Sequence, residues 1–462
     1  MQVTVSNNIR ITNPSLEIIT YCKNNLTLPN PDYVKKIRMG FYVGSTPKQL
    51  HLYEIHGGEW VLPYGCLKSI APMLKDAIVE SDFKPPVSID YGKSIPLYPY
   101  QEKAVYAMIH GNYGILQSPA GSGKTQMGIE LIKRYGKRTL WLTTTKDLLA
   151  QSKERAERYM DGNLLGTITE GKVNLGSGVT FATVQTMCKL DLLQYKHYWD
   201  VIICDECHHL AGTPTKITMF SKVLNNLSAR HKFGLTATPH RADGLIKATF
   251  ALIGEVTYSV PEEAIADRVL SVGIKTVATG ITQNRKCLNT DGTLNYTKLI
   301  NYITSNDERN RLIANEIVAN KGMSCIILSD RLDQLDTLMN MLPPDMKGQA
   351  VKIDGGMVTK VAKAMRSEGL QGMRDGEKKY LFATYALARE GLDVPCLERL
   401  FMASPIKDEA WVIQSVGRIA RTSGDKSEPI CFDFVDNIPH LLKMYKSRYK
   451  TYTRNNCYFI GE

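Results

Sequence analysis

A short glycine-rich turn constrains the fold of this chain more than any other feature of the sequence. The turn, Ser118-Pro119-Ala120-Gly121-Ser122-Gly123-Lys124-Thr125, follows the apolar pair Ile115-Leu116, and helix-forming residues continue to Tyr135. In a strand–turn–helix unit of this kind the backbone N–H groups point inward, and the helix N-terminus favours negative charge. The sequence therefore predicts a phosphate-binding loop formed by Gly121, Ser122, Gly123, Lys124 and Thr125.

Two side chains at the end of this turn indicate which phosphate compound binds there. Lys124 would reach the β- and γ-phosphates of a nucleoside triphosphate, and Thr125 would bind Mg²⁺. The first position of the turn is Ser118, where Gly or Ala is usual, and its small side chain should fit. The alternative is a glycine loop without a ligand. The flanking strand and helix favour the phosphate site, with ATP and Mg²⁺ as the expected ligands.

An acidic pair follows a second apolar strand, Val201-Ile202-Ile203-Cys204. Adjacent carboxylates at the tip of a buried strand are costly unless a cation balances them. We therefore expect Asp205 to hold Mg²⁺, directly or through water, and Glu206 to act as the general base toward a water molecule. The alternative is a solvated strand end. Upstream, Gln101 carries an amide whose donor and acceptor match the edge of adenine.

Three polar residues near the end of the chain recur with helical spacing. Gln414, Arg418 and Arg421 stand at i, i+4 and i+7, which predicts that they share one face of a helix. An arginine on that face could stabilise the charge that develops as the γ-phosphate is transferred. The alternative is a solvated basic helix.

The order of apolar segments predicts the fold class. Strands and helices alternate from about residue 95, and a second alternation begins near residue 325. This pattern is typical of parallel sheets covered by helices on both faces, so the expected class is α/β. Strand-like stretches at 3–5, 39–43 and 49–53 predict a small α+β domain ahead of them. We expect four segments: an accessory domain at 1–92, parallel-sheet domains at 93–260 and 261–440, and a basic C-terminal segment at 441–462.

Composition limits the class of partner. The net charge of +11 suits a polyanion such as nucleic acid, although charge alone leaves simple solubility as an equal alternative. No run of about 18 apolar residues is present and the chain does not begin as a secretory signal does, so no membrane partner is expected. Cys204 and Cys207 are the one C-x-x-C pair, and a structural zinc site would need a second pair. Reduced thiols and a cytoplasmic location are expected, in a bacterial host if the chain is phage-encoded.

Between residues 95 and 440 the motifs resemble those of superfamily 2 helicases. Gln101 is similar to the adenine-reading glutamine, Gly121 to Thr125 to motif I, and Asp205 to His208 to the DECH box. The resemblance implies two RecA-like domains, ATP hydrolysis, and coupling of ATP to nucleic acid. It also implies roles for individual residues: nucleotide binding by Gly391, Asp393 and Gln414, finger arginines Arg418 and Arg421, coupling by His208, Thr236 and Thr238, and backbone contacts to nucleic acid from Thr144, Thr145, Thr183, Gln185, Ser329, Arg331 and Thr384. Tyr385 departs from the acidic residue common after the motif V threonine.

Three longer runs narrow the resemblance. Residues 234–244, 416–421 and 432–436 are similar to phage branch-migration helicases of the UvsW type and to their XPB-like relatives. This implies an enzyme that acts on branched or forked DNA in recombination, replication or repair, with recombination or replication proteins as further partners. The accessory domain at 1–92 also resembles the DNA-binding module that precedes the motor in that group, which implies that it binds DNA. Three other functions stay open: a duplex-DNA translocase or remodeller, an RNA helicase, and a nucleotide-switched binding protein without translocation.

Overall fold

The chain forms two compact units, Met1–Ala264 and Ile265–Glu462, and each is described by itself. The structure is a computed structural model that describes residues 1–119, 121–210, 217–237, 244–355, 360–389, 392, 394–423, 426, 428–455 and 457–461. Thr238, Gly391 and Asp393, which were expected to contribute to the site, lie outside the described residues. No helix in those ranges is long and apolar enough to cross a membrane.

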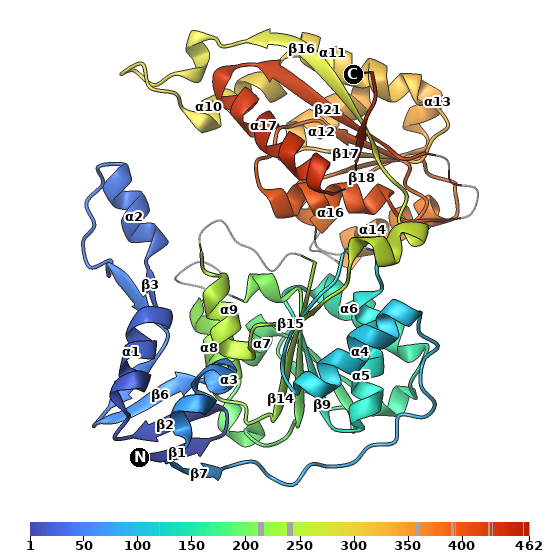
Figure 1. Ribbon diagram of the computed structural model, residues 1–462. Coiled ribbons are helices and arrows are strands. Elements are labelled where there is room, and N and C mark those ends of the chain that lie inside the picture. Colours follow the sequence, from blue (N-terminus) through green and yellow to red (C-terminus); the bar gives the residue numbers. More distant parts are fainter. Residues whose placement is uncertain are drawn as a thin grey trace. The chain divides into compact units, whose positions relative to one another are not determined.

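The first unit begins with a small five-stranded sheet in the order β5-β6-β2-β1-β7 (Figure 1). Apolar residues alternate along its central strands, so Val3, Val5, Ile9 and Ile11 are buried together. Helix α1 begins after Ser15, whose side chain accepts from the Ile18 N–H, and it packs on this core. The elements are β1 (Gln2–Val5), β2 (Asn8–Thr12), α1 (Leu16–Asn25), β5 (Glu54–His56), β6 (Glu59–Pro63), α3 (Leu67–Ile70) and β7 (Ile78–Ser81).

One predicted strand of this domain is wrong. Residues 39–43 form no strand; Met39 ends helix α2 (Pro31–Arg38), and the residues after it are exposed loop. The stretch has β-branched and aromatic residues, but none of the strands in the described ranges pairs with it. The two flanking strands, β3 (Thr27–Pro29) and β4 (Gln49–His51), pair with each other instead.

The second part of this unit is an eight-stranded sheet in the order β11-β10-β12-β9-β13-β14-β8-β15, parallel except at β11. Helices cover it, as the alternation of the sequence predicts. Its strands are β8 (Gly114–Gln117), β9 (Thr139–Thr143), β10 (Leu165–Thr169), β11 (Lys172–Asn174), β12 (Val179–Thr183), β13 (Val201–Asp205), β14 (His231–Thr236) and β15 (Val256–Ser259). Its helices are α4 (Pro99–Gly111), α5 (Lys124–Tyr135), α6 (Lys146–Glu157), α7 (Val184–Met187), α8 (Ile217–Leu224) and α9 (Ile246–Ile253).

The small sheet is docked tightly on the large one. A Cβ on Gly65 would lie 2.4 Å from the Gly254 backbone nitrogen and the Phe250 carbonyl oxygen, so only glycine fits at this contact. At the same interface Lys232 of β14 is fully buried and donates to the carbonyls of Asn7 (3.0 Å) and Leu224 (2.9 Å). Its ammonium lies 5.0 Å from the centre of the Tyr64 ring. A buried lysine side chain therefore connects the accessory sheet to an interior strand of the large sheet.

The second unit is a seven-stranded parallel sheet in the order β18-β19-β17-β20-β21-β16-β22. Its strands are β16 (Gly273–Thr282), β17 (Cys325–Leu328), β18 (Ala350–Ile353), β19 (Tyr380–Ala383), β20 (Arg399–Met402), β21 (Ile430–Asn437) and β22 (Tyr458–Phe459). Its helices are α10 (Tyr296–Thr304), α11 (Asp307–Ala319), α12 (Leu332–Met341), α13 (Pro344–Lys347), α14 (Lys360–Arg374), α15 (Tyr385–Arg389), α16 (Glu409–Ile419) and α17 (Pro439–Arg454).

The basic C-terminal segment folds as α17 and β22 and packs on this second sheet. Tyr452 is buried and its hydroxyl donates to Asp433 at 2.8 Å, while Tyr449 stacks on Phe459. Both of these tyrosines of α17 therefore contact other parts of the second unit. Arg448 is also buried and forms a bidentate ion pair with Asp433.

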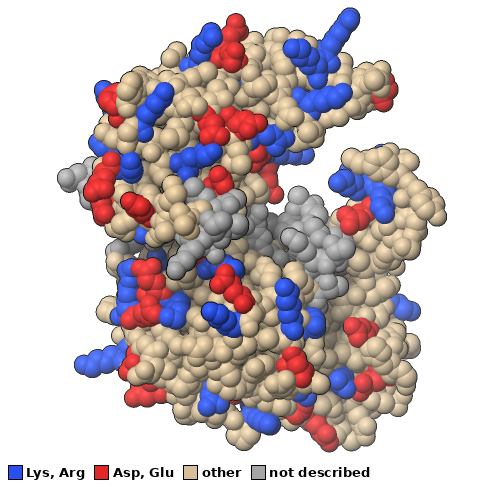
Figure 2. Space-filling model, turned by 180° about the vertical axis from the view of Figure 1, so that it is seen from behind, with Lys and Arg blue, Asp and Glu red and all other residues tan. Residues whose placement is uncertain are grey.

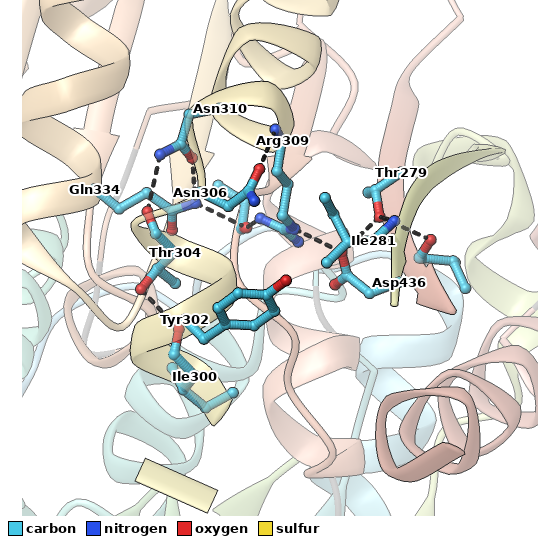
Figure 3. Close-up of polar contacts among 12 residues, drawn as sticks. Thr279, Ile281, Ile300, Tyr302, Thr304, Asn306, Arg309, Asn310, Gln334 and Asp436 are labelled. Atoms are coloured by element: carbon cyan, nitrogen blue, oxygen red, sulfur yellow. Dashed lines mark hydrogen bonds and ion pairs between the residues drawn. The ribbon is translucent and has the colours of Figure 1, made fainter. Parts of the chain in front are cut away.

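A second buried ion pair ties the carboxyl ends of three strands together (Figure 3). The Arg309 Nε donates to Asp436 Oδ1 at 2.8 Å, and its Nη1 donates to the Ala403 carbonyl at 2.6 Å. The same Asp436 oxygen accepts from Thr279 at 2.6 Å. Gln334 donates both to Asn310 and to the Ala403 carbonyl, so the network is continuous across the sheet edge.

Lys232 provides a test of the docking between the two sheets. Burial lowers the pKa of Lys232 to about 7 from an ordinary value of 10.5. Between those two pH values the unfolded lysine binds a proton that the folded one lacks, so its contribution to the stability of the first unit should rise with pH. We expect the difference between wild type and Lys232→Met to change by at most about 1.4 kcal/mol per pH unit over this range.

The measurement is the free energy of urea unfolding between pH 7 and pH 10, followed by tryptophan fluorescence. Both proteins carry Trp411→Phe, so that the signal comes from the first unit, which holds the other three tryptophans. The loss of the two carbonyl contacts lowers the free energy of unfolding of the variant by the same amount at every pH. The pH dependence of the difference between the two proteins therefore reports the titration of Lys232 alone. Parallel pH profiles for the two proteins would refute this role of Lys232.

Candidate active site

Three neighbouring parallel strands bring the predicted catalytic segments to one edge of the eight-stranded sheet. Strand β14 lies between β13 and β8, with Asp205 beside Leu235 and Thr236 beside Gln117. The carboxyl ends of parallel strands meet at a single edge, which is where α/β sheets bind ligands. The glycine-rich turn, the acidic pair and Thr236 therefore lie together, although they are far apart in sequence.

The glycine-rich turn has the backbone of an anion-binding loop. Gly121 and Gly123 have φ of 84° and 82°, values that side chains rarely tolerate, and helix α5 begins directly after them at Lys124. The Lys124 ammonium donates across the loop to the Ser118 carbonyl at 3.4 Å. Backbone N–H groups and a helix N-terminus thus converge with one cation, a combination that suits phosphate.

The serine that departs from the usual first position of this loop has a structural role. Ser118 is fully buried, and its hydroxyl lies 2.5 Å from that of Ser122, which in turn donates to the Pro119 carbonyl at 2.7 Å. The two hydroxyls hold the two ends of the turn together. Ser122 was expected to bind the ligand; its side chain instead supports the loop, and its backbone forms part of the turn.

Gln101 supports the same loop from behind. It is 2% exposed; its Nε2 donates to the Ser122 carbonyl at 2.9 Å, and its Oε1 accepts from the Tyr98 N–H at 3.1 Å. Tyr100, which the sequence reading did not single out, donates to the same carbonyl at 2.9 Å. Recognition of adenine by Gln101 stays a prediction, and the contacts seen are those that shape the turn.

The acidic pair is arranged for a divalent cation. Asp205 is 8% exposed, and burial raises its pKa, with the neighbouring Glu206 carboxylate adding to the shift and Lys124 opposing it. Glu206 has φ of 48°, a left-handed conformation that is uncommon for a residue with a side chain. Carboxylate and hydroxyl oxygens are the ligands that Mg²⁺ prefers. Asp205 and Thr125 therefore fit the expected metal, because a bound cation would offset the cost of a buried carboxylate.

A histidine connects this acidic pair to the next strand. His208 Nδ1 lies 3.4 Å from Glu206 Oε2 and 2.9 Å from Thr236 Oγ1, and both His208 and Thr236 are buried. The ring thus contacts the expected base and the end of β14 at once. The structure brings together two of the three residues expected to couple, since Thr238 is not described.

The expected nucleic-acid contacts of the first unit lie at the same edge, after β9 and β12. The exposed Gln185 donates to the Thr144 carbonyl at 2.8 Å, so the loops after these neighbouring strands are linked. Thr145 caps helix α6 by accepting from the Leu148 N–H at 3.3 Å. Thr183 is 4% exposed, and its hydroxyl bonds to Thr186 at 2.9 Å, so that hydroxyl faces the interior.

In the second unit one expected contact is wrong. Ser329 is fully buried; its hydroxyl donates to Gln334 at 2.6 Å and accepts from the Arg331 N–H at 3.0 Å, so it supports the network of Figure 3 and is not at the surface. Arg331 and Thr384 are half-buried at the ends of β17 and β19. Tyr385, which departs from the family pattern, is buried and donates to the Ser404 carbonyl at 2.6 Å.

The expected helical face of Gln414, Arg418 and Arg421 is only partly correct. Helix α16 ends at Ile419, and Arg421 lies beyond it, paired with Val269. The helix stops there because the Ala420 carbonyl accepts from the Leu270 N–H at 2.7 Å. Arg418 stays on the helix and donates to the Ala388 (2.9 Å) and Leu392 (2.7 Å) carbonyls. Its guanidinium thus holds the segment after β19.

The cysteines beside the acidic pair are free thiols. Cys204 and Cys207 are fully buried, and burial raises the pKa of the Cys204 thiol to about 12. Cys207 packs against β14, where a Cβ on Gly234 would lie 2.7 Å from its sulfur. Among the described residues no group of three or more His, Cys, Asp or Glu is placed to hold a metal ion.

Two family models match this chain, one in each of its two units. Residues 94–241 match the family model for the type III restriction enzyme res subunit, and residues 308–423 match that for the helicase conserved C-terminal domain. The putative ATP-dependent RNA helicase L396 of Acanthamoeba polyphaga mimivirus is 27% identical over 351 residues, 74% of this chain and 64% of that protein. The DNA 3'-5' translocase XPB2 of Sulfurisphaera tokodaii is 27% identical over 360 residues, 71% of this chain and 79% of that one. The chain spans less than two thirds of the mimivirus protein.

Solved structures support the fold. Dbp5 of S. cerevisiae, bound to RNA and ADP BeF3, aligns with a TM-score of 0.58 at 16% identity, covering 86% of this chain and 94% of that one. The crystal structure of T4 UvsW aligns with 100% of this chain and 99% of that one at 17% identity, with a TM-score of 0.42. With the family models, the first alignment confirms the predicted class of two RecA-like parallel-sheet domains after a small α+β domain.

Gly123 tests whether the loop binds a nucleotide. A Cβ at this position would lie 2.5 Å from Gln101 Nε2. Gly123→Ala should therefore displace the loop and weaken ATP binding at least about tenfold, a loss of about 1.4 kcal/mol. Calorimetric titration with a non-hydrolysable ATP analogue and Mg²⁺ measures the affinity.

Gly171→Ala is the matched control. Gly171 has a similar φ of 77° and open space around its Cβ position, on a hairpin distant in sequence from the loop. Both variants carry the cost of a left-handed alanine, about 1–2 kcal/mol, and only Gly123→Ala should lose affinity. Equal affinities in the two variants would show that the loop does not bind the nucleotide.

Proposed function

The chain belongs to the superfamily 2 helicases, and on that basis we propose that it hydrolyses ATP to move along DNA and remodels branched structures such as forks and four-way junctions. The observation that carries the proposal is the single sheet edge where the phosphate loop, the acidic pair and Thr236 lie beside the loops after β9 and β12. An enzyme that couples nucleotide chemistry to a polymer needs both kinds of loop on one rigid support.

The residues of the first unit suit hydrolysis of a phosphoanhydride. The backbone of 121–125 and the Lys124 ammonium would bind the phosphates, and Glu206 would take the proton of the attacking water. Mg²⁺, held by Thr125 and Asp205, would offset the negative charge of the phosphates. The left-handed backbone of Glu206 directs the base, and the His208 contact restrains its carboxylate.

The contacts of His208 suggest how the chemistry reaches the polymer. Glu206, His208 and Thr236 form a continuous polar chain from the expected base to the end of β14. A change in the charge of Glu206 would therefore alter the contacts of His208 and, through them, the hydrogen bond to Thr236. The linked loops of Thr144 and Gln185 offer backbone and amide groups, which suit phosphate contacts that hold a strand without reading its sequence.

Branched DNA is the proposed substrate because of its energetics and of the resemblance to UvsW-type enzymes. In branch migration each base pair that breaks is replaced by another, whereas strand separation costs about 1.4 kcal/mol of stacking per step. Two alternatives have their own support: the mimivirus relative is described as an RNA helicase, and the Sulfurisphaera relative as a DNA translocase. Protein partners in recombination or replication stay a prediction.

The decisive experiment compares a four-way DNA junction, a DNA fork, a blunt linear duplex with a bound third strand, and an RNA fork of the same sequence. We expect ATP-dependent rearrangement of the junction and the fork. Glu206→Gln is the matched control: it keeps the shape of the base but cannot take a proton, so it should bind ATP without turnover or rearrangement.

Faster action on RNA would make the protein an RNA helicase. Displacement of the third strand with no action on branches would make it a duplex translocase.

Substitution of Arg421 should affect ATP hydrolysis, whereas substitution of Arg418 should affect the stability of the second unit. We propose that Arg421 stabilises the transferring phosphate, so Arg421→Ala should keep ATP affinity and lose about 10³-fold or more in DNA-stimulated hydrolysis. Arg418 holds two carbonyls, so Arg418→Ala should instead lower the thermal midpoint of the second unit. Steady-state ATPase and calorimetry measure the two effects. A normal rate in Arg421→Ala would remove it as the finger arginine.

A further inference from the structure

An arm extends from the N-terminal sheet between the short strands β3 and β4. It comprises residues 30–48 and contains helix α2, in which no residue is buried. Figure 1 shows α2 standing away from the five-stranded sheet of its own unit. Because an isolated helix of this length is marginal in water, an exposed one is unusual unless it binds something.

The arm is nevertheless folded by contacts of its own. The Asn30 N–H donates to the Lys48 carbonyl at 3.1 Å and its side chain donates to the Pro47 carbonyl at 2.8 Å, which closes the base. Further out, the Phe41 N–H donates to the Lys36 carbonyl at 2.8 Å, and the Lys36 ammonium to Thr46 at 2.6 Å. These bonds fix the shape of the tip, so its side chains are presented in a defined arrangement.

The tip exposes large apolar side chains together. Ile37 is 58% exposed, Met39 56%, Phe41 62% and Tyr42 90%. Single exposed apolar residues are ordinary, but a group of four within six consecutive residues marks an interaction surface. The tip is therefore the part of the arm best suited to contact a partner.

The same arm concentrates positive charge. Residues 30–48 contain four basic residues and one acidic, whereas the other residues of 1–99 contain six basic and seven acidic. Figure 2 shows basic side chains gathered on the arm. Lys35, Lys36 and Arg38 lie on α2, and two residues separate the end of the helix from the aromatic pair Phe41 and Tyr42, so cations and rings lie close together in one short segment.

We propose that this arm binds unpaired bases of a DNA strand where a duplex branches, with Phe41 and Tyr42 stacking on the bases and the α2 cations contacting the adjacent phosphates. A cationic segment with exposed rings matches the chemistry of single-strand recognition, in which rings stack on any base. A purely apolar protein surface would not complement four cations. The inference rests on the proposed function, since it gives the DNA-remodelling enzyme a place to hold an opened strand.

The base of the arm is anchored on the ATP-binding domain. Leu28 of β3 packs with Leu245 and Ala248 at the start of α9, and Leu50 of β4 packs against the same group. Helix α9 covers the sheet that carries the acidic pair, and Leu245 follows Thr236 closely in sequence. The arm is thus held by the domain whose nucleotide state should change during the cycle.

The test compares affinity for a duplex that carries an unpaired tail with affinity for a blunt duplex. The double variant Phe41→Ala/Tyr42→Ala should lose about tenfold or more in affinity for the tailed DNA and little for the blunt duplex. Tyr106→Ala is the matched control, because Tyr106 is a 59% exposed aromatic residue on α4. Photocrosslinking of tails that contain 5-bromodeoxyuridine should map to residues 30–48.

The outcomes separate this inference from the proposed function. If ATP hydrolysis stimulated by single-stranded DNA stays normal in the double variant and only tail affinity falls, both hold. If the wild-type protein shows no DNA-stimulated hydrolysis, the proposed function fails, while direct binding still tests the arm. Unchanged tail affinity with no crosslink to 30–48 overturns the arm's role. So does a shift from dimer to monomer in the double variant with unchanged DNA affinity, which would make the tip an interface between copies.

Discussion

The parallel pairing of β13, β14 and β8 is the constraint on which the site depends. Adjacent strands lie about 4.8 Å apart, so the register that sets Asp205 beside Leu235 and Thr236 beside Gln117 also sets the spacing of the three loops. A shift of one residue would turn each side chain to the opposite face. The strands are buried on both faces by apolar residues, which keeps this register. Catalytic geometry is in this way a product of core packing.

The sequence predicts most of this site because its signals are local. A glycine turn, an acidic pair and a histidine each follow an apolar strand directly, and the chemistry of phosphate and magnesium restricts the residue types. The parallel α/β class predicts that these segments end at one edge of the sheet, but the order that makes β13, β14 and β8 neighbours is known only from the structure. The support around them could not be predicted: Ser118 and Tyr100 act through hydrogen bonds whose partners are set by tertiary folding.

The wrong predictions share a physical cause. Periodicity predicted that Arg421 continues the helix, but pairing of 420–421 with 269–270 ends it at Ile419. Ser329 was placed at the surface by resemblance, whereas the network of Gln334 and Arg309 draws it inside. At 39–43 the composition favours a strand, but no strand among the described residues lies beside this stretch to pair with it. In each case contacts distant in sequence override a local preference.

The net charge of the N-terminal domain is a further case in which the sequence alone is not enough, because the distribution of the charges becomes visible only in the structure. Summed over residues 1–99, basic and acidic residues nearly balance, so the charge count alone does not indicate a nucleic-acid site in this domain. The structure separates the two contributions: the arm at 30–48 has a net charge of +3, and the remaining residues of 1–99 have a net charge of −1. Lys232 of β14, which donates to the Asn7 carbonyl of this domain, is buried and contributes nothing to the outer surface. Because a potential falls off within about 8–10 Å at ordinary salt, a partner responds to the charge of the arm and not to the average of the domain.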